Sequence, residues 1–313
     1  MSALLDTTTR SLHGIALGKQ RDGRVPGLFA GVSRQGSLVW GEGVGQADLG
    51  GDRAPTPDDQ FLIASNTKTF IAVMVMQLRD EGRLTLDDLL GDHVPEVSHS
   101  LTIRQCLAHV SGMAREPLGD VWETLENPTD KELRRDFDDV ERVLRPHDHW
   151  HYSNVVYAML GQLVEELDGR SWEESLRTRL LDPLEMTRTS NGFDAGPHVS
   201  GYYVAPYDDV PRPEPVMDLK GLAPCGGLAS TADDRIRKKP RPIAPFQSWL
   251  LRRICGWHIS SIVSGESSSA GGSATHADHR ARSLAVLASP PHGAIARRSI
   301  TGSIRGTSSY GAT

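Results

Sequence analysis

A serine and a lysine three residues apart, Ser65 and Lys68, stand where a short apolar segment gives way to a longer apolar run. Within residues 71–78 the apolar side chains recur with the period of an α-helix, which predicts a buried helix that begins at or just before Ser65. The spacing of three places both side chains on one side of that helix, one turn apart. A serine hydroxyl becomes a nucleophile when a base lies close, and a lysine can serve. The alternative is an ordinary N-cap serine beside a solvated lysine.

A second group of polar residues, Tyr152-Ser153-Asn154, stands at the start of a strongly amphipathic stretch, 153–167. A positive charge near a phenol favours its ionised form, so a tyrosine beside a lysine tends towards the phenolate. A phenolate can take the proton of a serine hydroxyl and return it to a leaving group. Asn154 can hold a substrate amide or carbonyl with the two ends of its side chain. The alternative is a tyrosine packed at a helix start, with Ser153 as the N-cap.

Histidines and a cysteine form three weaker candidates. His109 can be a general base, but we expect it late in a helix, where a packing or helix-dipole role is favoured. His147, His149 and His151 alternate, as metal ligands on an extended chain would, yet no acidic or cysteine partner is spaced to join them. We interpret this segment as a polar connector and predict no metal site. Cys225 precedes two glycines and is expected to be a small buried side chain near a site rather than a nucleophile.

Composition limits the class of protein. The chain has 313 residues, of which 24% are charged and 38% hydrophobic, as in soluble globular proteins. Its net charge of −6 gives no indication of nucleic-acid binding, and no apolar run approaches the length of a membrane span. The first residues lack the basic and apolar regions of a signal peptide, so we expect a cytoplasmic protein. Three cysteines are too few and too scattered for a disulfide framework or a zinc site.

The order of the expected elements indicates an α+β fold. Residues 26–33 and 37–45 are predicted to form a β-hairpin, and 221–231 an extended segment. The helices are expected over 4–20, after Thr102, over 130–143, over 153–167 and after Ser171. A hairpin alone cannot bury its apolar face, so this one requires further strands from the C-terminal part of the chain.

Charge divides the chain at Asp234. Residues 1–234 hold 22 Lys and Arg against 38 Asp and Glu, whereas residues 235–313 hold 12 against 2. The second segment is also rich in Ser, Arg and Ala, and amphipathic periodicity is lost there. We therefore predict a domain over 1–234 and an atypical basic segment over 235–313. A frameshifted reading frame would produce this change, and the alternative is a divergent but genuine C-terminal part.

Taken together, the motifs resemble the serine β-lactamase and penicillin-binding-protein superfamily. Ser65-Asn66-Thr67-Lys68 and Tyr152-Ser153-Asn154, with the blocks 101–113 and 180–186, occur in the order of that family over about residues 25–234. The likeness is greatest to the class C-like branch of serine hydrolases, esterases and D-alanyl-D-alanine carboxypeptidases. It implies an antiparallel sheet flanked by helices, an all-helical lobe, and a site between them.

The resemblance also implies roles for four residues. Ser65 would be the acylated nucleophile, Lys68 its activating partner, Tyr152 the proton relay and Asn154 a substrate ligand. The substrate would be a small ester, amide or β-lactam, with no cofactor, no metal, no nucleic acid and no membrane partner. The expected function is a serine hydrolase that forms an acyl-enzyme, acting on esters or amides. The alternatives are a β-lactamase or D-alanyl-D-alanine carboxypeptidase, and an inactive family member.

One family motif is not identifiable. The resemblance implies that the backbone N–H of Ser65 is one donor of an oxyanion hole. The second donor comes, in this family, from a strand near the C-terminus that carries Lys or His followed by Thr, Ser or Gly and then Gly. No Lys-Thr-Gly, Lys-Ser-Gly or His-Gly-Gly follows Asp234. Cys255-Gly256-Trp257, Ala270-Gly271-Gly272 and His292-Gly293 are imperfect substitutes. The sequence therefore does not identify the C-terminal strands that the family's sheet contains.

Overall fold

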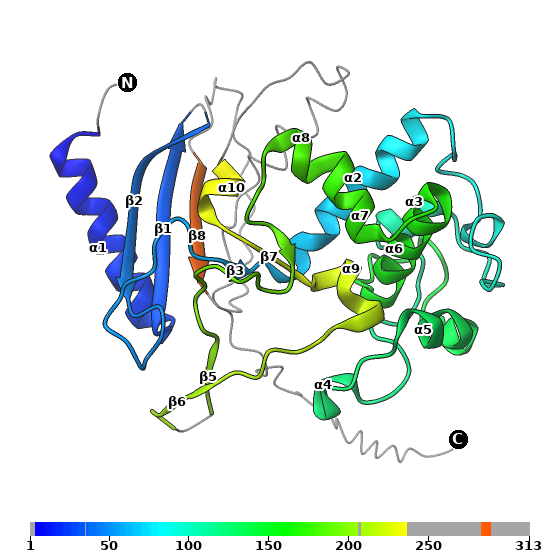
Figure 1. The fold of residues 1–313 in the computed structure, drawn as a ribbon. Helices are drawn as coiled ribbons and strands as arrows, with labels where there is room; N and C mark the ends of the chain where they lie inside the picture. The colour runs from blue at the N-terminus through cyan, green and yellow to red at the C-terminus, as the bar shows by residue number, and fades with distance from the viewer. Residues whose placement is uncertain (1–3, 35, 206–207, 237–282, 289–313) are drawn as a thin grey trace, which may run out of the picture.

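The computed structural model describes residues 4–34, 36–205, 208–236 and 283–288, and within them the fold is α+β. A sheet covered by one helix lies at one side of the molecule, and a group of helices lies at the other (Figure 1). The three imperfect substitutes for the third motif all fall outside the described residues. No helix in the described ranges combines the length and apolarity that a membrane span requires. The cytoplasmic location stays a prediction.

The sheet is built on the predicted hairpin. Strand β1 (Gly27–Arg34) pairs antiparallel with β2 (Ser37–Gly45), and on its other edge with β8 (Ser283–Ala288). The expectation that the hairpin takes a further strand from the C-terminal part is thus confirmed for one strand. Strand β1 is central in the order β2-β1-β8, and its successive residues Leu28, Phe29 and Ala30 are all buried, so both of its faces are covered.

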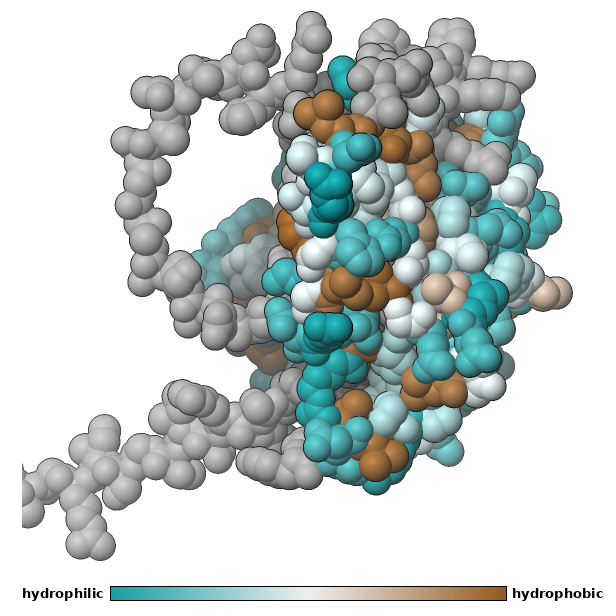
Figure 2. Space-filling model, turned by 90° about the vertical axis from the view of Figure 1, so that its left-hand side faces the viewer, coloured by the Kyte–Doolittle hydropathy of each residue, from teal (hydrophilic) through white to brown (hydrophobic). Residues whose placement is uncertain are grey.

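Helix α1 (Asp6–Asp22) covers one face of this sheet, close to the predicted 4–20. Leu28 and Ala30 point to that side and pack with Ala16 of the helix. Phe29, between them, points to the opposite face and packs with Phe61. Figure 2 views the side that carries α1 and β2, where hydrophilic residues surround separate hydrophobic patches.

The helical lobe is organised around α2 (Thr67–Asp80) and α6 (Asn154–Asp168). The predicted apolar face of α2 is confirmed, since Ile71, Met74, Val75 and Leu78 are fully buried. The shorter helices around this pair are α3 (Ile103–Leu107), α4 (Val121–Thr124), α5 (Asp130–Asp136), α7 (Trp172–Leu176), α8 (Asp182–Leu184) and α9 (Ala223–Gly226).

Local capping signals placed several helix ends correctly. The Thr102 side chain accepts a hydrogen bond from the Gln105 backbone N–H, and the Gln105 side chain accepts one in return. Ser153 and Ser171 cap α6 and α7 in the same way, without the reciprocal bond. Gly169 ends α6 at φ +66°, a conformation that glycine adopts without strain.

Two predicted elements differ from the structure. The helix expected over 130–143 ends at Asp136 and is followed by one 3-10 turn, Phe137–Asp139. Residues 141–144 instead pair with 112–114 through backbone hydrogen bonds, which competes with helix continuation. The segment expected to be extended over 221–231 is helical in α9, and only β7 (Leu228–Ser230) is a strand.

Short strands connect the two parts of the molecule. Strand β7 lies between β3 (Phe61–Leu62) and β4 (Ser190–Asn191). The other short elements are β5 (Tyr202–Val204), β6 (Pro211–Pro213) and α10 (Ala232–Ile236). Since β3 leads directly into the Ser65 turn, the β3-β7-β4 sheet fixes where that serine lies.

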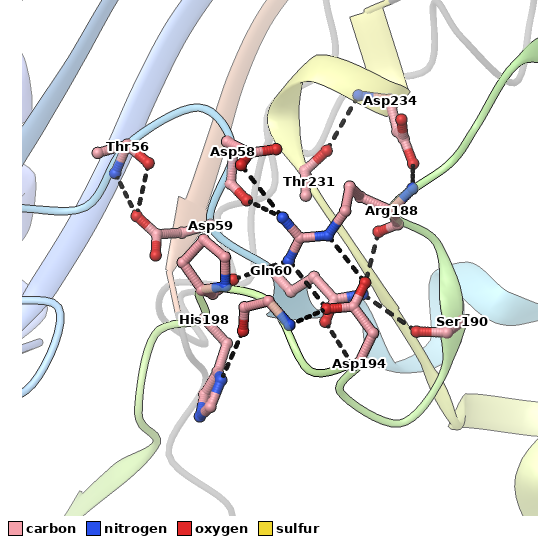
Figure 3. Close-up of polar contacts among 12 residues, drawn as sticks. Thr56, Asp58, Asp59, Gln60, Arg188, Ser190, Asp194, His198, Thr231 and Asp234 are labelled. Atoms are coloured by element: carbon pink, nitrogen blue, oxygen red, sulfur yellow. Dashed lines mark hydrogen bonds and ion pairs between the residues drawn. The ribbon is translucent and has the colours of Figure 1, made fainter.

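A polar cluster centred on Arg188 supports this small sheet (Figure 3). The Arg188 guanidinium binds both carboxylate oxygens of Asp194, at 2.8 and 3.0 Å, and Asp58 at 3.1 Å. Its backbone N–H donates to Asp234 at 2.8 Å, and its carbonyl accepts from Gln60 at 3.0 Å. Hydrogen bonds from Arg188 hold the pKa of Asp194 below its ordinary value. The cluster therefore joins the segment just before β3 to two segments that are distant in sequence, 188–194 and the one around Asp234.

Replacing glycine by alanine should have opposite effects at two helical positions, one packed against α9 and one open. A Cβ at Gly161 would lie 2.4 Å from Pro224, whereas nothing lies within 4 Å of a Cβ at Gly18. We expect Gly161→Ala to lower the free energy of unfolding by about 1–3 kcal/mol through overpacking. Gly18→Ala, in α1, should raise it by up to about 1 kcal/mol through helix propensity. Urea denaturation measures both, and a shift of the same sign in the two variants would contradict the α6–α9 packing.

Candidate active site

The turn that presents Ser65 is held by its neighbours and carries backbone strain. The Ile63 N–H donates to the Leu228 carbonyl at 2.8 Å, which continues the β3–β7 pairing up to the turn. Ala64 then adopts φ +44°, a left-handed conformation that is unfavourable for a residue with a Cβ. The Asn66 side chain donates to the Ile63 carbonyl at 2.8 Å and closes the turn before α2. Ser65 itself is exposed, so its hydroxyl is open to a substrate.

Lys68 lies one turn further, buried, with an ammonium group that meets three oxygen atoms. Its Nζ donates to Asn154 Oδ1 and to the Cys225 carbonyl, both at 2.7 Å, and to Ser65 Oγ at 3.5 Å. An ammonium carries three N–H donors, which matches these three acceptors. A charge with only 5% exposure needs such partners, because burial without them is costly.

Tyr152 approaches Ser65 from the start of α6. Its hydroxyl donates to Ser65 Oγ at 2.7 Å. The Lys68 Nζ lies 4.7 Å from the centroid of the Tyr152 ring, and the Arg115 guanidinium carbon lies 5.5 Å from it. Cations near an aromatic face stabilise its position electrostatically. Ser65 Oγ is therefore in contact with a phenol and an ammonium that the sequence placed far from each other.

Asn154 completes the group of four residues singled out in the sequence. Its Oδ1 accepts from Lys68, and its Nδ2 donates to the two carboxylate oxygens of Glu116 at 2.9 and 3.1 Å. Sequence analysis expected both ends of this amide to be available for a substrate. In the structure both ends contact protein groups, and Glu116 was not anticipated, since no local pattern marks it.

The position of His109 differs from the prediction, although its role does not. It lies beyond the end of α3 at φ +57°, not late in a helix. Its ring lies 4.6 Å from the ring of Tyr152 and 4.8 Å from that of Tyr157, and its Nδ1 accepts from the Ser153 N–H at 3.2 Å. Burial, with a smaller contribution from the Lys68 charge, lowers the pKa of His109 to about 4. The predicted packing role is thus confirmed.

The remaining candidates take structural places. Cys225 is buried, as predicted, and burial raises the pKa of its thiol to about 11, which does not suit a nucleophile. His147 adopts φ +65° and contacts Gln105 at 3.1 Å, so the alternation of an extended chain is not kept. Within the described ranges, no group of three or more His, Cys, Asp or Glu is arranged to hold a metal ion.

Comparison with known proteins identifies the family of the chain. The Beta-lactamase family profile matches residues 12–237. Protein flp of Staphylococcus aureus is 29% identical over 175 residues, 54% of this chain and 35% of that protein. Penicillin-binding protein 4 of Amycolatopsis lactamdurans is 32% identical over 245 residues, 74% of this chain and 59% of that protein. The octameric penicillin-binding protein homologue from Pyrococcus abyssi has a TM-score of 0.64 at 26% identity, covering 74% of this chain and 55% of that one.

The match over most of the described chain defines a β-lactamase/transpeptidase-like fold with helices and antiparallel sheets. The chain belongs to the Beta-lactamase family. It spans about a third of the length of Protein flp and rather more than half of the other two relatives.

The half-buried His109 predicts a loss of stability on acidification. Its pKa lies near 4 in the folded state against 6.5 for an unperturbed histidine, so the unfolded state binds more protons between these values. The contribution of neutral His109 to the free energy of unfolding is therefore fully present above pH 6.5 and is lost as the pH falls towards 4. His109→Gln, which keeps an acceptor for Ser153, removes this contribution. Urea denaturation between about pH 7.5 and 5 should show a smaller loss of unfolding free energy in the variant, and parallel curves would contradict a half-buried neutral imidazole.

Proposed function

We propose that the protein is a serine hydrolase that forms an acyl-enzyme on Ser65 and releases it by reaction with water. The observation that carries the proposal is the position of Ser65 Oγ, 2.7 Å from the Tyr152 oxygen and 3.5 Å from Lys68 Nζ. A nucleophile, a proton acceptor and a positive charge are the components that acyl transfer requires. The exposed Ser65 and the buried Lys68 fit these roles, because only the nucleophile must reach a substrate.

Acylation would begin once Tyr152 has released its hydroxyl proton to solvent, and its oxygen would then take the proton of Ser65 Oγ, 2.7 Å away. Lys68 is less suited to accept that proton, since its three N–H donors are committed to three acceptors and the ammonium form is the one they match. Oγ then bonds to the substrate carbonyl carbon, whose oxygen becomes an oxyanion facing the Ser65 backbone N–H. Collapse breaks the bond to the leaving group, which takes the proton from Tyr152.

Deacylation repeats these steps with water. A water molecule gives its proton to Tyr152 and bonds to the acyl carbon, and collapse of the second tetrahedral intermediate breaks the bond to Oγ. The proton returns to Ser65. Asn154 is proposed to orient the substrate, and its contact with Lys68 gives it a second role in holding the ammonium.

Small esters or amides are the proposed substrates. A β-lactam or a D-alanyl-D-alanine peptide is the second candidate, favoured by the similarity to Penicillin-binding protein 4 and to the Pyrococcus homologue. An inactive family member is the third, because no third motif is identifiable after Asp234.

Residues 235–313 are proposed to be an atypical segment, with a catalytic domain over 1–234. The abrupt change in charge and the missing third motif support a shifted reading frame. Resequencing the gene tests this proposal. A His-Gly-Gly or Lys-Thr-Gly codon run in another frame is the expected result, and its absence from every frame would support a divergent end instead.

Two substitutions test the catalytic proposal. Ser65→Ala should abolish hydrolysis of p-nitrophenyl esters and labelling by a fluorophosphonate. Tyr152→Phe should lower kcat/KM by about 10²–10⁴-fold, because it removes the proton relay and keeps the ring. Ser100→Ala, at an exposed serine, is the matched control and should behave as the wild type.

Equal labelling of the wild type and Ser65→Ala would remove Ser65 as the nucleophile. Hydrolysis of a chromogenic cephalosporin without hydrolysis of esters would favour the second candidate substrate. A folded wild type that neither hydrolyses these compounds nor is labelled would support the inactive alternative.

A further inference from the structure

The carboxylate of Glu116 lies at the end of the Asn154 amide opposite to Lys68. Both of its oxygens are within hydrogen-bond distance of Asn154 Nδ2, at 2.9 and 3.1 Å. The other end of the same amide, Oδ1, accepts from Lys68 Nζ at 2.7 Å. A continuous chain of hydrogen bonds thus runs from Glu116 through Asn154 and Lys68 to Ser65 Oγ.

The chemistry of the two flanking groups allows only one orientation of this amide. An ionised carboxylate accepts hydrogen bonds and donates none, whereas an ammonium donates and accepts none. A flipped Asn154 would turn its NH2 towards the ammonium and its oxygen towards the carboxylate, and both hydrogen bonds would be lost. Asn154 and Lys68 are 6% and 5% exposed, so water would not replace those bonds readily.

Glu116 is itself held in position by Arg115. The Arg115 Nε donates to Glu116 Oε1 at 3.0 Å, and the Arg115 carbonyl accepts from the Asn154 backbone N–H at 2.7 Å. The segment 115–116 is therefore attached to the first residue of α6 by its backbone and by its side chain. The Glu116 side chain is 20% exposed, so most of it is enclosed by the protein.

We infer that Glu116 is a positioning residue of the hydrolase: it fixes the Asn154 amide with its oxygen towards Lys68 and thereby holds the ammonium beside Ser65. This inference rests on the proposed function for its kinetic consequences. It does not make Glu116 a catalytic residue, since the carboxylate acts only through Asn154. A glutamine at position 116 presents either an oxygen or an NH2, so it no longer selects one orientation of the amide.

A double-mutant cycle tests the inference in the full chain. Glu116→Gln should lower kcat/KM for a p-nitrophenyl ester by about 5–100-fold, chiefly through kcat, as expected for a lost buried charged hydrogen bond. In the Asn154→Ala background the same substitution should change kcat/KM by less than about twofold, because its effect passes through the missing amide. Additive effects in the cycle, or wild-type kinetics in Glu116→Gln, would overturn the inference.

Two further variants separate positioning from charge and from general damage. Glu116→Asp keeps the charge but is one methylene shorter, so it should lose activity like Glu116→Gln; full activity would show that charge alone suffices and would overturn positioning by contact. Glu126→Gln, at an exposed glutamate of the same lobe, is the matched control and should retain wild-type kinetics.

The same cycle read out as unfolding free energy keeps the inference testable if the enzyme proposal fails. A wild type with no Ser65-dependent hydrolysis would contradict the proposed function alone. The coupling between Glu116 and Asn154 in urea denaturation would still be expected, since the hydrogen bonds exist without a substrate. Absence of that coupling would overturn the inference whatever the activity.

Discussion

The burial of one positive charge, the ammonium of Lys68, constrains the whole site. A buried ammonium needs acceptors on every N–H, and here they are Ser65 Oγ in the turn before α2, Asn154 Oδ1 at the first residue of α6, and the carbonyl of Cys225. Asn154 and Cys225 are 86 and 157 residues away from Lys68 in the sequence. The requirement that they converge fixes the relative position of the central helices and the segment before β7. Ser65 and Tyr152 meet because both are attached to these same elements.

The rest of the fold prepares that convergence. The Arg188 cluster (Figure 3) and the β3-β7-β4 sheet fix the segment before the Ser65 turn. In that turn Ala64 adopts the strained φ of +44°. On the α6 side, His109 packs against Tyr152 and accepts from the Ser153 N–H, so the phenol approaches Ser65 from a supported helix start. Rigid supports of this kind are what a preorganised site requires, because small displacements of reacting atoms lower rates strongly.

Sequence analysis succeeded where the signal is local. The apolar face of α2, the caps at Thr102 and Ser153, the αL glycine at Gly169 and the hairpin each depend on residues a few positions apart. The four candidate site residues came from motifs in the sequence, and the structure brings their side chains together; their catalytic roles stay predictions. Sequence spacing alone does not give the contacts among their side chains.

Failures occurred where distant segments decide the outcome. The helix expected over 130–143 was cut short because residues 141–144 pair with 112–114. The contact of Glu116 with Asn154 and the position of His109 beyond α3 were not predicted. Nothing nearby in sequence distinguishes a glutamate or histidine that contacts the site from one in solvent. The apolar face of the hairpin predicts that a further strand exists, and β8 is that strand. Its position could not be predicted, because residues 283–288 show no alternation of apolar and polar side chains.

The most direct measurement of the central claim is the rate at which a fluorophosphonate modifies Ser65, followed by peptide mass spectrometry in the wild type and in Lys68→Met. Our account predicts an adduct on the peptide that contains Ser65, formed at least about 10²-fold more slowly when the ammonium is replaced by an apolar group. An adduct on another residue, or equal rates in the two folded proteins, would contradict the claim that Lys68 organises and activates this site.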